Sequence, residues 1–518
     1  MNIALRKLAS FLPDRRISGL ESGIFASSRG DARPSIKSLG ALMILAAAAS
    51  GCFPTENAAA ETINAALTRA YNTNPELNRD RAGVRVRDED VAKAWSGMRP
   101  SAGAQGSVGP QTSEFRFPIP DIRIPLTGNT ISIPPVNPIN GKRVAIQQSF
   151  FGVPRGGSFN VSQTLFDGGR TTNAVGEAEA GVFAARAMAE LTEQMTLQSG
   201  AAAYMNVMRD TAILSLRKNN ISNLELQLYN TQQRLRVGEV TNTDVSQAEA
   251  ALAQARSDYA ASQAQLRNSI ADYHQIIGVD PGRLEPASSI ERLLPAALEE
   301  AIDVAIQEHP SVRAAMSEVD AAEFAVHGAE STLAPTLSLD GQVQQQEDFF
   351  GYHGARLFAA DVRASLKVPL YQRGEEYASI RQSKEKLGRA RLELDVQRGK
   401  VRANVVTTYG RLQAAKAQIK SDQAMVKAAE AALNGVRREA QAGQRTTLDV
   451  LNAHQALLNA RTNLLISQSD RVIASYMALA AIGRLSAERL RLDVIPHDPT
   501  LHFEEVKFKS FGFDADGR

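Results

Sequence analysis

The sequence predicts a mainly α-helical chain with a small β-sheet part, built from a tandem repeat. Three observations support this fold class: two long stretches without proline, four short segments that alternate polar and apolar residues, and similar residues that recur at a constant spacing. Hydrophobic residues make up 43% of the chain, but aromatic residues make up only 6%. This balance suits alanine-rich helices in close contact better than a core of large side chains.

The repeat appears as residues that match at a fixed offset, 235 residues early in the chain and 205 residues later. Matches at the first offset are Asn74-Pro75 with His309-Pro310, and Pro100 with Pro335. Matches at the second are Tyr204 with Tyr409, Gly238 with Gly443, Asp244 with Asp449, and Ile277-Gly278 with Ile482-Gly483. The offsets differ by 30 residues, so the first copy carries one insertion of that length, between Val108 and Phe166.

The insertion is rich in proline, with seven prolines between positions 110 and 138. No helix or central strand tolerates this density, so the segment 110–140 is expected to be an extended surface loop. The chain then divides into a leader, a first copy, a second copy and a C-terminal periplasmic tail. Their bounds are 1–60, 61–287, 288–490 and 491–518.

Each copy is expected to contain three helical stretches. In the first stretch of the second copy, Ile302, Ala305 and Ile306 have the spacing of one helix face. The predicted ranges are 61–98, 170–236 and 244–278, then 296–333, 375–441 and 449–483. The two longest would extend about 100 Å each, so they must pack beside partners of similar length as coiled coils.

The alternating segments are read as strands. Polar and apolar residues alternate without an error over 361–368, and they alternate over 336–344 and 158–166 as well, while 101–108 is weaker. One apolar and one polar face suit either a sheet on a core or a membrane barrel. The long helices leave no apolar layer to cover a sheet, so the barrel is preferred. Four strands cannot close a barrel alone, and so several subunits must combine: two would supply eight strands and three would supply twelve.

The leader has the layout of a secretory signal peptide with an extended n-region. Two processing sites compete. The lipobox-like Ala49-Ser50-Gly51-Cys52 would make Cys52 a lipidated N-terminus, whereas Ala58-Ala59-Ala60 would release a chain that starts at Glu61. The second is preferred, because lipoboxes usually carry Leu or Val where Ala49 stands. Cys52 is the only cysteine, so no intrachain disulfide is expected.

Several classes of function find no support in the residues. The net charge is +2, from 58 basic and 56 acidic residues, and no basic run is interleaved with aromatics, so no nucleic acid is expected as partner. The seven histidines show no paired-ligand spacing. No serine or cysteine nucleophile has a recognisable setting. We therefore expect no enzymatic activity, no cofactor and no metal.

Three segments resemble the TolC-like outer-membrane channel family, and the resemblance covers nearly all of 61–490. They are Gln163–Arg170, Val237–Val245 and Gly443–Leu451. The tail from His497 to Lys509 is similar to members that serve type I protein secretion. The resemblance implies a homotrimer with a 12-stranded transmembrane β-barrel, four strands per subunit, in contact with outer-membrane lipid. It also implies a long coiled-coil barrel across the periplasm, a periplasmic adaptor, and an inner-membrane ABC or proton-driven pump.

The resemblance also implies a gate at the periplasmic entrance. Arg445 and Asp449 match the family's entrance arginine and one acidic ring, and Thr243 and Asp244 match their bonding partners on the neighbouring helix pair. Two positions depart from the family: Asn452 replaces the second acidic ring, and Ala440 replaces a tyrosine. The entrance should therefore be less negative and less tightly closed. The turns that contact the adaptor would be formed around Gly238, Thr241, Gly443 and Thr446.

One alternative stays open on the residues alone, a periplasmic coiled-coil adaptor or structural scaffold without a membrane barrel. An adaptor would normally carry an inner-membrane anchor and small globular β-domains. The sequence does not identify the cargo, which could be a secreted protein or a drug.

Overall fold

We describe a computed structural model of the chain that covers residues 60–126, 129–137, 139 and 143–513. Apart from Ala60, the predicted signal segment lies outside these residues, and so does Cys52. Helices dominate the described part and strands form a smaller part, which confirms the predicted fold class. Of the helices described, none combines the length and the hydropathy needed to cross a membrane.

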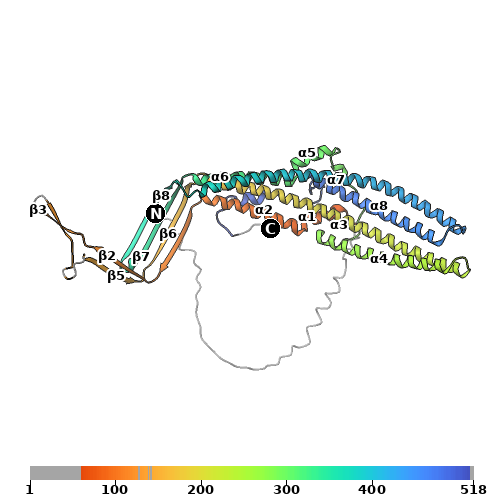
Figure 1. The fold of residues 1–518 in the computed structure, drawn as a ribbon, viewed down its shortest axis with the longest axis horizontal. Helices are drawn as coiled ribbons and strands as arrows, with labels where there is room; N and C mark the ends of the chain where they lie inside the picture. Colours follow the sequence, from red (N-terminus) through yellow and green to blue (C-terminus); the bar gives the residue numbers. More distant parts are fainter. Residues whose placement is uncertain (1–59, 127–128, 138, 140–142, 514–518) are drawn as a thin grey trace, which may run out of the picture. The chain divides into compact units, whose positions relative to one another are not determined.

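The helices follow the same plan in both copies (Figure 1). The first copy contains α1 (Ile63–Thr73), α2 (Pro75–Trp95), α3 (Arg170–Arg236) and α4 (Asn242–Ile277). The second contains α5 (Leu298–Glu308), α6 (Pro310–Glu330), α7 (Glu375–Gln441) and α8 (Thr447–Ala481). A short helix, α9 (Thr500–Val506), lies in the tail. The bounds of α3 and α7 are those predicted from the sequence.

The first helical stretch of each copy was expected to be continuous, and this prediction was wrong. Asn74 separates α1 from α2, and His309 separates α5 from α6, with extended ψ angles of 123° and 128°. Each precedes a proline, whose ring disfavours helical backbone at the preceding residue. The proline itself is well placed as the first residue of the next helix, where no N–H is needed.

The helices pack in pairs: α3 lies along α4, and α7 lies along α8 (Figure 1). The C-terminal end of α4 meets the break between α1 and α2, where Thr73 Oγ1 donates to the Ile277 carbonyl (3.2 Å) and Asn74 Nδ2 donates to the Ile276 carbonyl (3.1 Å). The end of α8 meets the equivalent break at His309. There Gly483 approaches so closely that a Cβ atom would lie 2.6 Å from His309 Cα.

A core of buried side chains lies where these ends meet the long helices. Tyr204, Tyr273 and Tyr476 are fully buried there, with Leu67 and Leu485 in the same cluster. The Tyr204 hydroxyl lies 2.7 Å from the Glu61 carbonyl oxygen and 2.6 Å from that of Glu285. This contact joins the start of the described chain, α3, and the connection between the two copies.

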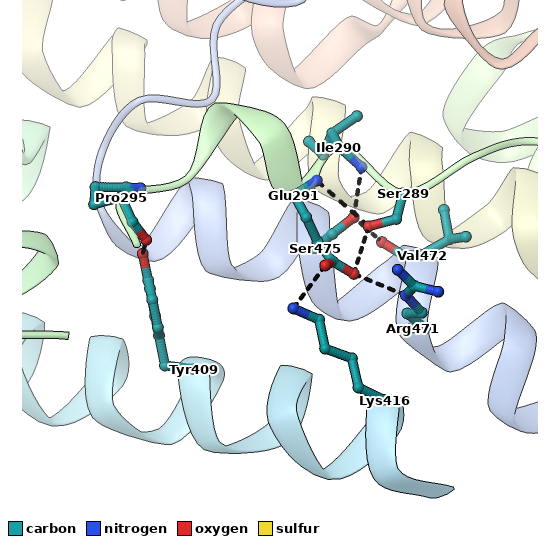
Figure 2. Close-up of polar contacts among 9 residues, drawn as sticks. All are labelled: Ser289, Ile290, Glu291, Pro295, Tyr409, Lys416, Arg471, Val472 and Ser475. Carbon is teal, nitrogen blue, oxygen red and sulfur yellow. Dashed lines mark hydrogen bonds and ion pairs between the residues drawn. The ribbon is translucent and has the colours of Figure 1, made fainter. Parts of the chain in front are cut away.

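The connection between the copies is held against α7 and α8 by one carboxylate (Figure 2). Glu291 forms ion pairs with Lys416 of α7 (2.6 Å) and Arg471 of α8 (2.8 Å). Burial would raise the pKa of Glu291, but hydrogen bonds from Arg471, Lys416 and Ser289 outweigh it and lower the pKa to about 2. Nearby, Tyr409 donates to the Pro295 carbonyl at 3.1 Å.

Four antiparallel strands form one sheet in the order β1, β6, β7, β8, so each copy supplies two. They are β1 (Ser101–Val108), β6 (Arg155–Phe166), β7 (Thr336–Glu347) and β8 (Arg356–Lys367). The register places residues of like polarity side by side. Val161 pairs with Gly341 and then Val362, whereas Ser162 pairs with Asp340 and then Arg363. Across these three strands, one face is therefore mainly apolar and the other polar, as the alternation predicted.

The proline-rich insertion is not the irregular loop that was expected. It contains two antiparallel ladders, β2 (Gln111–Pro118) with β5 (Ala145–Gly152), and β3 (Ile122–Leu126) with β4 (Asn129–Ile133). Several prolines lie at the ends of these ladders instead of interrupting them. Two-stranded ladders also leave outer edges on which proline removes no ladder hydrogen bond.

Candidate functional site

The candidate site consists of two turns, Val237–Thr241 and Ala442–Thr446, which join α3 to α4 and α7 to α8. In each, a glycine takes the left-handed conformation, with φ 77° at both Gly238 and Gly443. The following backbone N–H then bonds back over the helix end, from Glu239 to Arg234 (2.9 Å) and from Gln444 to Glu439 (2.9 Å). Glycine is favoured here because a Cβ atom destabilises left-handed backbone.

The helices that leave the turns begin with the same capping box. Thr241 Oγ1 accepts from the Asp244 N–H (3.3 Å), while the Asp244 carboxylate accepts from the Thr241 N–H (2.9 Å). Thr446 and Asp449 repeat these bonds at 3.2 and 3.0 Å. Each pair satisfies backbone donors that the first turn of a helix leaves free. The aspartates therefore have a structural role besides any role in a gate.

Hydrogen bonds lower the pKa of both carboxylates. The backbone N–H of Thr241 lowers the pKa of Asp244, and the backbone N–H of Thr446 lowers the pKa of Asp449. The Thr447 hydroxyl also lowers the pKa of Asp244. Since Thr447 lies at the start of α8, the two turns lie next to each other in one chain.

The ion pairs of the two turns have opposite polarity. In the first turn, Arg234 of α3 pairs with Glu239 at 3.0 Å. In the second, Glu439 of α7 pairs with Arg445 at 2.9 Å. The helix thus supplies the cation in one turn and the anion in the other, and the exposed tip carries the reverse charge.

The structure places all predicted gate residues at these turns but does not connect all of them. Thr243 and Arg445 are exposed, as is Asn452 one helical turn beyond Asp449. Within the described residues of one chain, no hydrogen bond or ion pair joins Arg445 or Asp449 to Thr243 or Asp244. The predicted contact between neighbouring helix pairs stays a prediction.

Sequence reasoning missed Glu439 and Thr447 as members of this site. The available signal was a pair of opposite charges across each turn, Glu439 and Arg445 six residues apart and Arg234 and Glu239 five residues apart. Ala440, which replaces the expected tyrosine, is buried and adds no polar group.

Comparisons with known proteins agree with this architecture. The outer membrane efflux protein family matches residues 66–279 and 301–484, more than half of the chain. The chain is 37% identical to the outer membrane efflux protein BepC of Brucella suis over 92% of its length and 98% of that protein. It is 26% identical to the outer membrane protein TolC of Vibrio cholerae over 57% of this chain and 69% of that one.

A solved structure shows the same fold. The CmeC outer membrane channel of Campylobacter jejuni superposes with a TM-score of 0.66 at 14% identity, over 86% of this chain and 89% of that one. The repeat of long helices, the four-stranded sheet and these matches agree with one another. The chain belongs to the outer membrane efflux protein family of TolC-like channels, with its sheet part in the outer membrane and its helical part in the periplasm.

Proposed function

We propose that three copies of this chain join their sheets into one 12-stranded barrel and form the exit duct of a tripartite export system. The duct would receive protein or small-molecule cargo from an inner-membrane ABC or proton-driven pump, through a periplasmic adaptor. The cargo would cross the periplasm between the long helices and leave through the barrel. Energy would come from the pump.

The sheet is the observation that carries this proposal. In the described part of the chain, β1 pairs only with β6 and β8 pairs only with β7, so both outer strands keep an open edge. Open edges are not tolerated in lipid, because unpaired backbone groups find no water there. Four strands are also too few to close on themselves. A polar interior with room for passage favours twelve strands over eight, which side chains would fill.

The assembly is tested by native mass spectrometry of the mature protein in detergent micelles. The expected mass is that of three chains. A monomer that stays dissolved without any detergent would overturn the proposal.

The cargo is tested in a separate experiment. Deletion of the gene should either remove proteins from the culture medium or raise the sensitivity of the cells to drugs. Whichever of the two changes identifies the class of cargo.

The second part of the proposal is that Arg445 and Asp449 close the periplasmic entrance through contacts with the neighbouring helix pair. Exposed charge pairs contribute only ~0.2–1 kcal/mol each, so such a closure can be held and still be released by a partner. The observation in support is that both residues lie at the far end of the helices that leave the sheet, and that Arg445 is exposed.

Conductance in planar bilayers tests the gate. Arg445→Ala should raise the conductance of the resting channel severalfold. Glu439→Gln removes only the partner of Arg445 within the chain, and should leave conductance low if the closing contact lies between helix pairs. Arg461→Ala is the matched control, since Arg461 pairs with Glu430 (2.6 Å) farther along α8. Equal conductance for Arg445→Ala and Arg461→Ala would exclude a gate at Arg445.

A further inference from the structure

We propose that residues 507–513 of the C-terminal tail are an anchor that inserts aromatic side chains into the phospholipid surface next to the sheet. This interaction surface is independent of cargo, pump and adaptor. It rests on the placement of the sheet in the outer membrane.

Buried polar contacts hold the middle of the tail on α2 and α3. His502 Nδ1 lies 2.9 Å from a carboxylate oxygen of Asp88, which is fully buried in α2. Arg186 of α3 lies 3.9 Å from the same carboxylate and donates to the Pro499 carbonyl at 3.1 Å. Since a buried carboxylate is costly without partners, these contacts define one position for the tail.

The tail runs along α2 from its beginning to its end. At the beginning, the backbone N–H of His497 donates to the Tyr71 hydroxyl, just before α2 (3.1 Å). At the end, the Trp95 and Phe508 rings lie 5.9 Å apart, and Arg99 donates to the Lys509 carbonyl at 3.0 Å. With 21 residues, α2 is about 30 Å long. The segment around Lys509 therefore lies beside Arg99, two residues before β1 begins.

The side chains exposed at this place are aromatic and basic. Phe511 and Phe513 are essentially fully exposed, at 93% and 105%, and Phe508 is exposed as well. Lys509 is exposed beside them, whereas Lys507 is half-buried, with its Nζ 5.7 Å from the centre of the Phe508 ring and 3.4 Å from Glu179 of α3. Aromatic rings at the level of the headgroups are typical of protein segments at a membrane surface.

The same level of the molecule carries other exposed apolar side chains. Phe166 ends β6 where the sheet meets α3, and Leu370 and Tyr371 follow β8 where the sheet meets α7. All three are exposed. The exposed rings of the tail thus lie at the level where the sheet meets the helices, as these three side chains do. Phospholipid is the occupant that fits both the strands and the tail.

The test uses tryptophan fluorescence, since Trp95 is the only tryptophan of the chain. In full-length protein carrying Trp95→Phe, a single tryptophan is introduced by Phe511→Trp or, in a second variant, Phe513→Trp. The proteins are reconstituted into vesicles of phosphatidylethanolamine and phosphatidylglycerol with or without brominated acyl chains. We expect both tryptophans to emit at shorter wavelength than in water and to lose intensity when the lipid is brominated.

Two control positions make the result decisive. Ile495→Trp, in the same background, lies in the same tail and is as exposed (91%), but at the other end of α2, so brominated lipid should not quench it. Val362→Trp reports on the apolar face of the sheet and should be quenched. Quenching at 362 without quenching at 511 and 513 overturns the anchor alone. No quenching at any of the four positions overturns the placement of the sheet in lipid as well.

Acrylamide identifies what replaces lipid if the anchor is wrong. Tryptophans at 511 and 513 that acrylamide quenches and brominated lipid does not would show that the tail end is in water. Protection from both quenchers would show that it is covered by protein. Either result overturns the proposal.

Discussion

Asn74 and His309 cap equivalent helices in the two copies, each with a side-chain acceptor directed at the backbone of a helix that starts with proline. Asn74 Oδ1 accepts from the N–H groups of Glu76 (2.9 Å) and Leu77 (3.2 Å). His309 Nδ1 accepts from the N–H of Ser311 at 3.2 Å. The histidine is 7% exposed, and burial lowers its pKa to about 4.

The first prediction concerns His309→Asn and pH. In the unfolded chain the histidine titrates near its ordinary pKa of ~6.5, so the folded state binds its proton less tightly. Neutral His309 therefore makes its full contribution to the free energy of unfolding above about pH 6.5. As the pH falls toward the folded pKa, this contribution decreases by at most about 3 kcal/mol. The asparagine keeps the cap and cannot titrate. Thermal unfolding in detergent should therefore show a smaller loss of stability between about pH 7 and pH 4 for the variant. Equal losses in both proteins would contradict this account.

The second prediction concerns Glu291, which joins α7 to α8 (Figure 2). Its depressed pKa means that its contribution is present above the ordinary glutamate value and is lost as the pH falls toward about 2. Because Lys416 and Arg471 are partly exposed, Glu291→Gln should lower the free energy of unfolding by only about 1–2 kcal/mol. Glu393→Gln is the control, since that glutamate is exposed and its contacts, with Gln397 (2.7 Å) and Lys400 (3.9 Å), lie within one helix. Equal effects of the two substitutions in chemical denaturation would contradict a special stabilising role for Glu291.

The third prediction compares two tyrosines that are equivalent in the repeat. Tyr204→Phe removes a hydroxyl that lies against two carbonyl groups and should cost about 1–3 kcal/mol. Tyr409→Phe removes one longer bond, to Pro295, and should cost about 0.5–1.5 kcal/mol. Thermal unfolding of the two variants side by side gives the order. A larger loss for Tyr409→Phe would contradict it.

The fourth prediction concerns the glycine of the second turn. Gly443→Ala forces a Cβ atom onto left-handed backbone and should destabilise the turn by about 1 kcal/mol. Gly435→Ala lies inside α7 with no atom near its Cβ position, so it should stabilise the helix by about 0.5–1 kcal/mol. Hydrogen exchange at the Gln444 amide should quicken in the first variant only. No difference between the two variants at that amide would refute a special role for Gly443.

The sequence predicted the long helices well and the breaks in the shorter ones poorly. Both ends of α3 and α7 agree with the prediction, because freedom from proline and a glycine just before the helix are local signals. The residue pairs Asn74-Pro75 and His309-Pro310 were noted as repeat markers, although their local meaning is a helix break. The strand faces were predicted because alternation needs no knowledge of the partner strand. The ladders in the insertion were missed because pairing between distant residues decides them.

The sequence predicted where the candidate site lies, but not which of its residues contact one another. Motifs located Thr241, Asp244, Thr446 and Asp449 at the turns. The capping boxes depend on spacing of three residues and could have been derived from the sequence. The pairing of Arg445 with Glu439 depends on the turn geometry, which brings a helix end and a loop residue together. Side-chain contacts between copies depend on how the chains pack together, which the local sequence does not determine.

The opposite polarity of the ion pairs in the two turns affects how many copies of a partner protein could bind to them. A threefold assembly would present six tips in alternation, three ending in Glu239 and three in Arg445. If a partner consisted of identical units, each unit could make the same charged contacts only with every second tip. Such a partner must therefore bind in threes, or bind in sixes with two distinct modes of contact.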